Sequence, residues 1–232
     1  MGFDKVGHFV FGVVVKARMD RDGYLACIGG TDQLAVLPTA YADGVYRVHD
    51  RLCAAIQSVP ALGTGELYPK LTQRSGHFLR HVCHMVFRSL IEERRVAIEA
   101  VATVQHASFC KIAVSSPSGE DPIKLCMPVL GEFRSYSRLQ LSLIRYSHMI
   151  GEYIKSALKP APTDSILRLE LSRPERSATV VVPSAQMGRF LGQRGINVAV
   201  ASRLTGHSIR IVAENAVMTP TDELRRVAHV ER

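Results

Sequence analysis

The N-terminal third of the chain alternates between short apolar runs and turn residues, a pattern typical of β-strands. Apolar runs predict five strands, at 9–15, 24–28, 33–37, 52–59 and 65–71. Asp-Arg-Asp-Gly at 20–23 and the segment 29–32 predict tight turns, because glycine supplies the positive φ that such turns need. Pro38 ends the third strand. Five short strands with one longer loop indicate a small closed barrel of the OB type.

Apolar residues change to helical spacing after residue 72. One recurs every four positions and predicts a helix over 75–92: Phe78, Val82, Val86 and Leu90. The segments that follow predict strands at 96–104 and 109–115, a short helix from 121, a strand at 139–145 and a helix at 148–158. Pro160-Ala161-Pro162 then predicts a short linker, because proline cannot continue a helix.

The third segment repeats the plan of the second. It predicts strands at 166–171 and 179–182, helices at 183–190 and 196–204, and a closing strand at 208–212. Both segments read strand, strand, helix, short turn, helix, strand, and such a repeat indicates two related domains. We therefore predict an α+β multidomain chain with an OB-type barrel at 1–72, related domains at 73–159 and 160–213, and a tail at 214–232.

Composition excludes several classes of protein. Hydrophobic residues make up 47% of the 232 residues, so a packed core is expected rather than general disorder. No apolar run approaches the roughly 20 residues that a membrane span needs, and the N-terminus does not read as a signal peptide. The five cysteines are scattered and mostly inside apolar runs. They predict buried free thiols in a reducing cytoplasm, rather than disulfides or a zinc site.

Positive charge is concentrated in the second and third segments. Residues 1–70 hold seven Lys/Arg and seven Asp/Glu, residues 71–159 hold twelve and seven, and residues 160–213 hold seven and three. A polyanion partner is the inference from this distribution, and a generally basic surface is the alternative.

The segment FLGQRGINVAVASRLTG at 190–206 gives that charge a specific use. Two glycines, Gly192 and Gly195, bracket Gln193 and Arg194 between two short helical patterns. Glycines without Cβ atoms allow a nucleic-acid backbone to approach closely, and the N–H groups that open the next helix favour phosphate oxygens. A G-x-x-G turn with strands before it and a strand after it predicts a KH domain, which grips about four nucleotides of single strand.

The whole arrangement resembles the bacterial transcription elongation and termination factor NusA. FLGQRGINVAVASRLTGHSIRIV is similar to that family's last KH domain, and FCKIAVSS followed by DPIKLC is similar to its first. The resemblance covers about residues 8–213 and implies an S1-like barrel followed by two KH domains of the prokaryotic type (type II). It also implies a non-catalytic cytoplasmic protein that binds nascent single-stranded RNA and contacts RNA polymerase or other transcription factors. No cofactor, metal or membrane is implied.

The resemblance carries over residue by residue only at the last KH domain. The RNA-binding residues expected from it, together with neighbouring side chains, are Arg189, Gly192, Gln193, Arg194, Gly195, Asn197 and Arg203. For Asn197 and Ser202 the alternative is local helix hydrogen bonding, and for Arg189 it is a solvated side chain.

The chain departs from the family's pattern in three places. After DPIKLC comes Met-Pro-Val-Leu-Gly, so the first KH domain is expected to have a degenerate clamp and to act as a spacer or protein contact. The chain begins almost at the barrel, so pausing through the family's N-terminal polymerase-binding domain is not carried over. The barrel has no clear aromatic cluster for base stacking, and Phe9, Phe11 and Tyr24 are expected in the core.

Other functions remain open at this point. His77, His81 and His84 have a spacing that suits a metal, but the surrounding arginines favour a solvated, weakly basic helix face. RNA binding in ribosome assembly or translation is the alternative function. An RNA-degrading enzyme is disfavoured, because no carboxylate cluster or nucleophile–base pair stands out in the sequence.

Overall fold

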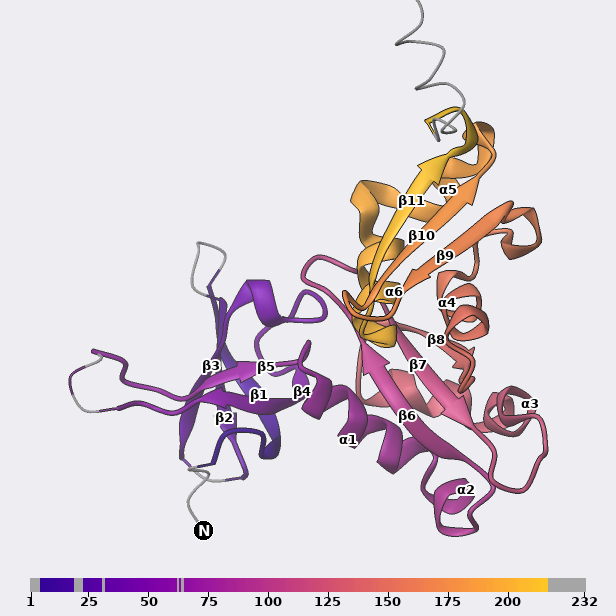
Figure 1. Cartoon of the computed structure of the whole chain (residues 1–232). Coiled ribbons are helices and arrows are strands. Elements are labelled where there is room, and N and C mark those ends of the chain that lie inside the picture. Colours follow the sequence, from indigo (N-terminus) through magenta and orange to yellow (C-terminus); the bar gives the residue numbers. More distant parts are fainter. Residues whose placement is uncertain (1–4, 19–22, 31, 62, 64, 217–232) are drawn as a thin grey trace, which may run out of the picture. The chain divides into compact units, whose positions relative to one another are not determined.

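The computed structural model describes residues 5–18, 23–30, 32–61, 63 and 65–216. The chain divides into two compact units, 1–146 and 147–232 (Figure 1). The turn expected at 20–23 and most of the tail expected at 214–232 lie outside the described residues.

The first unit begins with the predicted barrel. Its strands are β1 (Phe9–Arg18), β2 (Gly23–Ile28), β3 (Leu34–Leu37), β4 (Arg51–Ser58) and β5 (Lys70–Thr72), and they close in the order β1-β2-β3-β5-β4. The prediction of a five-stranded OB-type barrel is confirmed. The last strand is shorter than the expected 65–71, because Gly65 has a positive φ and Pro69 has no N–H to donate to a neighbour.

A KH domain of the prokaryotic type completes the first unit. Its elements are α1 (Gly76–Val86), α2 (Arg88–Glu92), β6 (Ala97–Ala102), β7 (Phe109–Ser115), α3 (Pro122–Cys126), the 3₁₀ segment η2 (Met127–Ser135) and β8 (Gln140–Arg145). β7 pairs antiparallel with β6 and parallel with β8. The single helix expected over 75–92 is broken at Phe87, whose φ of −101° and ψ of 19° lie outside the helical range. Ser75 caps α1 by accepting a hydrogen bond from Phe78 N.

The barrel and the first KH domain share buried contacts. Cys53 and Ala55 of β4 belong to the hydrophobic core that Phe78 and Ile112 help to form. The carboxylate of Asp43, which is 8% exposed, accepts hydrogen bonds from Ser137 Oγ at 2.8 Å and from the backbone N–H of residue 138 at 2.7 Å. A shared core and a buried carboxylate with partners across the junction explain why these two modules form one unit.

The second unit is another KH domain. Its elements are α4 (Ile150–Leu158), β9 (Arg168–Ser172), β10 (Ser177–Val182), α5 (Met187–Leu191), α6 (Ile196–Thr205) and β11 (Ser208–Ala213). β10 lies in the middle of the sheet, antiparallel to β9 and parallel to β11. The fold class expected from the sequence, a barrel followed by two KH domains, is therefore confirmed.

Helix α4 lies with the second KH domain, although the boundary expected at 159/160 assigns it to the first. It packs against α6, and the Tyr153 hydroxyl donates a hydrogen bond to Leu204 O at 3.1 Å. With α4 counted in this way, each KH domain has a helical segment, two strands, two further helical segments and a strand; in the first domain the opening segment is α1 with α2, and the last helical segment is the 3₁₀ segment η2.

Candidate nucleic-acid interface

The G-x-x-G motif forms a tight turn between α5 and α6. Gly192 has φ 70° and ψ 175°, Arg194 has φ 53° and ψ 27°, and Gly195 has φ 73° and ψ 10°. All three φ values are positive, which glycine adopts freely and an arginine adopts at a cost. The turn therefore holds the side chain of one charged residue, Arg194, in an unusual and exposed position.

The two glycines do different work. A Cβ atom on Gly192 would lie 2.8 Å from the Cβ of Asn197 and 3.1 Å from its backbone N, so this glycine allows the chain to pack closely on α6. A Cβ atom on Gly195 would have no neighbour within 4 Å in the part of the chain that the structure describes. Gly195 therefore leaves open space beside the backbone, which is what the approach of another backbone requires.

Asn197 is a correction to the expected RNA-binding set. Its side chain is only 6% exposed, and its Nδ2 donates hydrogen bonds to Leu158 O at 3.0 Å and Phe190 O at 2.9 Å. These carbonyls lie at the C-terminal ends of α4 and α5, where helix carbonyls lack intrahelical partners. Asn197 therefore holds the turn in place from inside, through bonds to two other helices and not through the local helix hydrogen bonding that was the alternative. Ser202 also bonds outside its own helix, since its Oγ accepts a hydrogen bond from Ile209 N of β11.

The outer surface of the turn is suited to an anion. Gln193 and Arg194 are exposed, and Gly195 is the N-cap residue of α6. Among the residues that the structure describes, no side chain caps that helix end, and the Ile196 N–H donates to the backbone carbonyl of Gln193. No Asp or Glu occurs anywhere in 183–213. The turn therefore presents an exposed positive charge at the positive end of the α6 dipole, in a segment whose sequence has no carboxylate to oppose a phosphate.

The two remaining expected residues lie at different distances from the turn. Arg189 is exposed on α5, and its guanidinium donates to Gln186 Oε1 at 3.3 Å. Arg203 is exposed in the last turn of α6, roughly 10 Å along the helix axis from its start at 1.5 Å per residue. Arg189 therefore lies just before the turn in the sequence, whereas Arg203 lies at the far end of α6.

The corresponding segment of the first KH domain has no such turn. Residues 127–135 form one continuous 3₁₀ segment, and Gly131 is not among the described glycines with a positive φ. Val129 and Leu130, at the positions that Gln193 and Arg194 occupy in the second domain, pack against the hydrophobic core. Apolar side chains that turn inward leave no charged, open clamp here.

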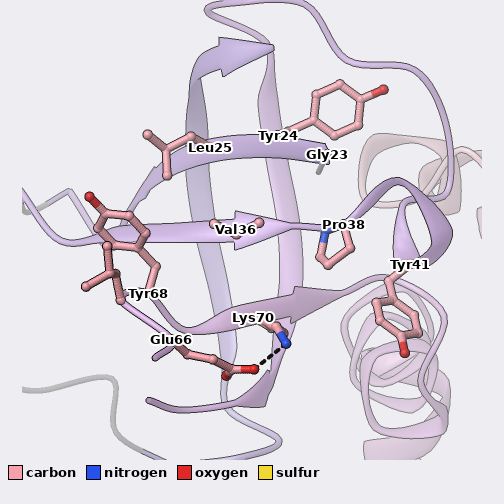
Figure 2. Close-up of a pocket in the computed structure, with 10 residues that line it drawn as sticks. Gly23, Tyr24, Leu25, Val36, Pro38, Tyr41, Glu66, Tyr68 and Lys70 are labelled. Carbon is pink, nitrogen blue, oxygen red and sulfur yellow. Dashed lines mark hydrogen bonds and ion pairs between the residues drawn. The ribbon is translucent and has the colours of Figure 1, made fainter. Parts of the chain in front are cut away.

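The barrel carries a second candidate surface, which the sequence analysis missed. A groove of about 520 Å³ lies over β2, β3 and β5, the strand face with which OB folds bind oligonucleotides. Tyr41 and Tyr68 stand at its two ends, and an ion pair between Lys70 and Glu66 lies along one edge (Figure 2). Tyrosine rings beside a lysine are groups on which bases stack. The only signal in the sequence is that both tyrosines lie next to Pro-containing loops.

The aromatic residues of β1 and β2 divide between core and surface. Tyr24 is 7% exposed and belongs to the barrel core, as expected. Phe9 is partly buried against the core of the first KH domain. Phe11 is 57% exposed, so its expected place in the core is wrong.

The histidines of α1 are exposed or stacked on a neighbouring ring in the described structure. Among the described residues, no group of three or more His, Cys, Asp or Glu side chains is arranged to hold a metal ion. The His81 ring instead stacks on Phe9, with ring centroids 4.3 Å apart. Partial burial, together with the neighbouring His84, lowers the pKa of His81 below its usual value.

Comparison with known proteins places this geometry in a family context. Residues 150–218 match the family model described as the NusA-like second KH domain. The resemblance to NusA is confirmed. Proteins named transcription termination/antitermination protein NusA are similar to most of the chain: that of Thermus thermophilus is 29% identical over 98% of it, and that of Halalkalibacterium halodurans is 25% identical over 87%. The NusA of Bacillus subtilis is 23% identical over 86%.

The chain spans about half the length of these NusA relatives, since it covers 53%, 58% and 54% of them. The matched family model includes α4 with the second KH domain, in agreement with the contacts of Tyr153. In the part of the chain that the structure describes, no helix has the length and apolar character needed to cross a membrane.

Proposed function

We propose that this chain is a non-catalytic, NusA-like protein that binds single-stranded RNA and acts on nascent transcripts in elongation, termination or antitermination. The observation that carries the proposal is the turn at 192–195, with its open space at Gly195 and exposed Arg194 at the uncapped start of α6. The transcription step is supported by the name shared by the similar proteins.

The physical basis is a clamp on the RNA backbone. One phosphate lies beside Gly195, near the positive end of the α6 dipole, where the Arg194 guanidinium donates hydrogen bonds to its oxygens. Such a clamp holds about four nucleotides of a single strand, and a duplex is excluded because its bases are paired and stacked and cannot be splayed onto the protein. Arg189 and Gln193 extend the contact on the α5 side.

The three modules have different roles in this proposal. The second KH domain, with its intact turn, binds the RNA backbone. The first KH domain, whose residues 127–135 lack a clamp, supports the barrel and offers a surface for a transcription protein such as RNA polymerase. The barrel groove between Tyr41 and Tyr68 is available to further bases of the same strand.

A matched pair of arginines provides the test. Arg194 and Arg176 are both exposed, both in turns of the second unit, and both at positive φ, 53° and 46°. Arg194→Asp is expected to weaken binding of a single-stranded oligoribonucleotide by about 1–3 kcal/mol, through lost charge-assisted hydrogen bonds and new repulsion. Arg176→Asp has the same change in charge and is expected to stay within about 0.5 kcal/mol.

Fluorescence anisotropy titrations at several salt concentrations measure both effects. The slope of log affinity against log salt is expected near −0.7 for each phosphate neutralised, and it should become shallower in Arg194→Asp. Equal losses in the two variants, or equal affinity for duplex and single strand, would refute the clamp. Crosslinking in cells then tests the biological role, and recovery of ribosomal RNA in place of nascent transcripts would move the proposal to ribosome assembly.

A further inference from the structure

The outer face of strand β1 is unusually apolar. Val10 and Val14 point into the barrel core, as strand alternation requires. The alternate residues of the strand, on its outer face, are also apolar, and Phe11, Val13 and Val15 are 57%, 38% and 44% exposed. An exposed phenylalanine at the centre of an apolar stripe indicates a contact surface.

The Phe11 ring is held in a defined position by its neighbours. Its centroid lies 5.2 Å from that of Phe9 in an edge-on arrangement. Phe9 in turn stacks on the buried Phe78 at 5.7 Å and on the exposed His81 at 4.3 Å. A chain of rings therefore runs from the core of the first KH domain to the surface, where Phe11 and His81 are exposed. Such anchoring lowers the entropy lost when a ligand stacks on the outermost ring.

A hollow of about 350 Å³ adjoins Phe11 in the barrel wall. Gly12 forms part of its lining, and a Cβ atom there would lie 2.9 Å from the carbonyl oxygen of Cys27, so a side chain does not fit. Arg51 lies at the rim, paired in register with Val13 of β1. The hollow thus combines an aromatic wall, an apolar lining and one exposed guanidinium.

The charge of β1, β4 and α1 is one-sided, and the loop after Gly30 carries one carboxylate, Asp32. The sequences of β1, β4 and α1 contain no Asp or Glu, but they supply Lys16, Arg51 and a face of three histidines. Asp50 precedes β4, and its carboxylate is paired with Arg138 at 3.1 Å. Aromatic rings in a cationic, carboxylate-poor surface complement bases joined by phosphates, whereas an acidic protein segment would use the charge but not the exposed ring face.

We propose that the outer face of β1 is a second contact for single-stranded RNA, in which a base stacks on Phe11 and its neighbouring phosphate pairs with Arg51. This surface is separate from the groove over β2, β3 and β5 that Figure 2 shows. The inference rests on the proposed RNA binding and adds to it a site in the other unit of the chain.

The test uses the full chain and a single-stranded RNA of about 20 nucleotides that contains 2-aminopurine, a base whose fluorescence falls when it stacks. Phe11→Ala is expected to reduce affinity at least about five-fold, the low end for one base–aromatic stack, and to remove part of the quenching. Phe11→Tyr keeps a ring and should restore both. Arg51→Gln should make the slope of log affinity against log salt shallower by about 0.7.

The matched control is Met127→Ala, because Met127 is an apolar residue of the same unit with nearly the same exposure, 56%. Equal affinity and quenching in Phe11→Ala and Met127→Ala, with Arg194→Asp still defective, would overturn this site and leave the clamp intact. It would assign the patch to a protein partner instead. If neither Phe11→Ala nor Arg194→Asp weakens RNA binding, the proposed function is refuted as well. Melting curves confirm that each variant is folded.

Discussion

The two glycines of the 192–195 turn are predicted to respond in opposite ways to alanine. At Gly192 the backbone has φ 70° and ψ 175°, a region that only glycine readily adopts, which costs an alanine about 1–3 kcal/mol. The new Cβ atom also meets Asn197, which its two hydrogen bonds hold in place, and such overpacking costs about 1–3 kcal/mol more. Gly195→Ala meets no neighbour within 4 Å, so only a left-handed penalty of about 1 kcal/mol applies.

The effects of the two alanines on RNA affinity are predicted to have the opposite order, when affinity is calculated for the folded fraction of each variant. The methyl group of Gly195→Ala occupies the space where the phosphate must approach, so affinity should fall about ten-fold, which equals about 1.4 kcal/mol. Gly192→Ala places its methyl group against α6, away from the ligand. Its folded fraction should therefore bind RNA nearly as the unaltered chain does.

Two measurements separate these effects. Hydrogen exchange of the β10 amides reports the stability of the second unit within the full chain, and anisotropy titration with a six-residue RNA reports the clamp. In a unit of this size, 1 kcal/mol corresponds to about 4–8 °C in melting temperature. The melting temperature of the Gly192→Ala variant should therefore fall by more than about 10 °C. Equal destabilisation by both alanines would show that the space at Gly195 is closed. A folded Gly195→Ala with unchanged affinity would show that RNA does not pass there.

Three further predictions concern stability. Asn197→Ala should lower the free energy of unfolding by about 2–4 kcal/mol in urea titrations, since it leaves two helix-end carbonyls without donors. The RNA affinity of its folded fraction should change little. Leu130→Asp should lower the free energy of unfolding by more than about 2 kcal/mol, because the side chain packs against the core. Met127→Asp, at an exposed site, should change it by no more than about 0.5 kcal/mol. Equal losses would show that the segment 127–135 is not packed as described. Because the pKa of His81 is lowered in the folded chain, the unfolded chain binds the proton more readily, and stability should fall as pH drops below about 6.5. His81→Phe keeps a ring on Phe9 and should flatten that part of the melting-temperature profile; an unchanged profile would contradict this assignment.

The barrel could be predicted from the sequence because strand boundaries are marked by glycine, proline and turn residues. Which residues face inward could be predicted less well. In β1 both faces are apolar, so alternation does not distinguish Val10 and Val14, which are buried, from Phe11 and Val13, which are exposed. A strand with two apolar faces reads as fully buried, and only the closure of the barrel reveals which face is outside.

The place of α4 could not be predicted from local pattern. Its apolar spacing predicts a helix, and Pro160 and Pro162 predict a break after it, but neither shows which domain the helix packs against. That is decided by contacts with α6, such as the hydrogen bond from Tyr153 to Leu204, which lies 51 residues further along the chain. Long-range contacts of this kind leave no periodic trace in the sequence.

The G-x-x-G segment shows the same limit at the level of single side chains. The motif and its flanking helices could be predicted, because glycine spacing and helix periodicity are local. The direction of each side chain could not, since polar residues at a helix start serve equally as caps, internal links or ligand contacts. Burial decides between these roles: Asn197 turns inward and Arg194 outward.

The inward turn of Asn197 also explains why the outward surface exists. Its Cβ atom fills the space that Gly192 leaves vacant, and its amide group ties the ends of α4 and α5 to the start of α6. With the turn held from behind in this way, nothing has to cover it from the front. Arg194 can keep a positive φ, and Gly195 can leave its backbone open, without loss of order. The proposed RNA clamp therefore depends on both halves of the motif: a glycine that packs against an asparagine, and a glycine with open space beside it in the described part of the chain.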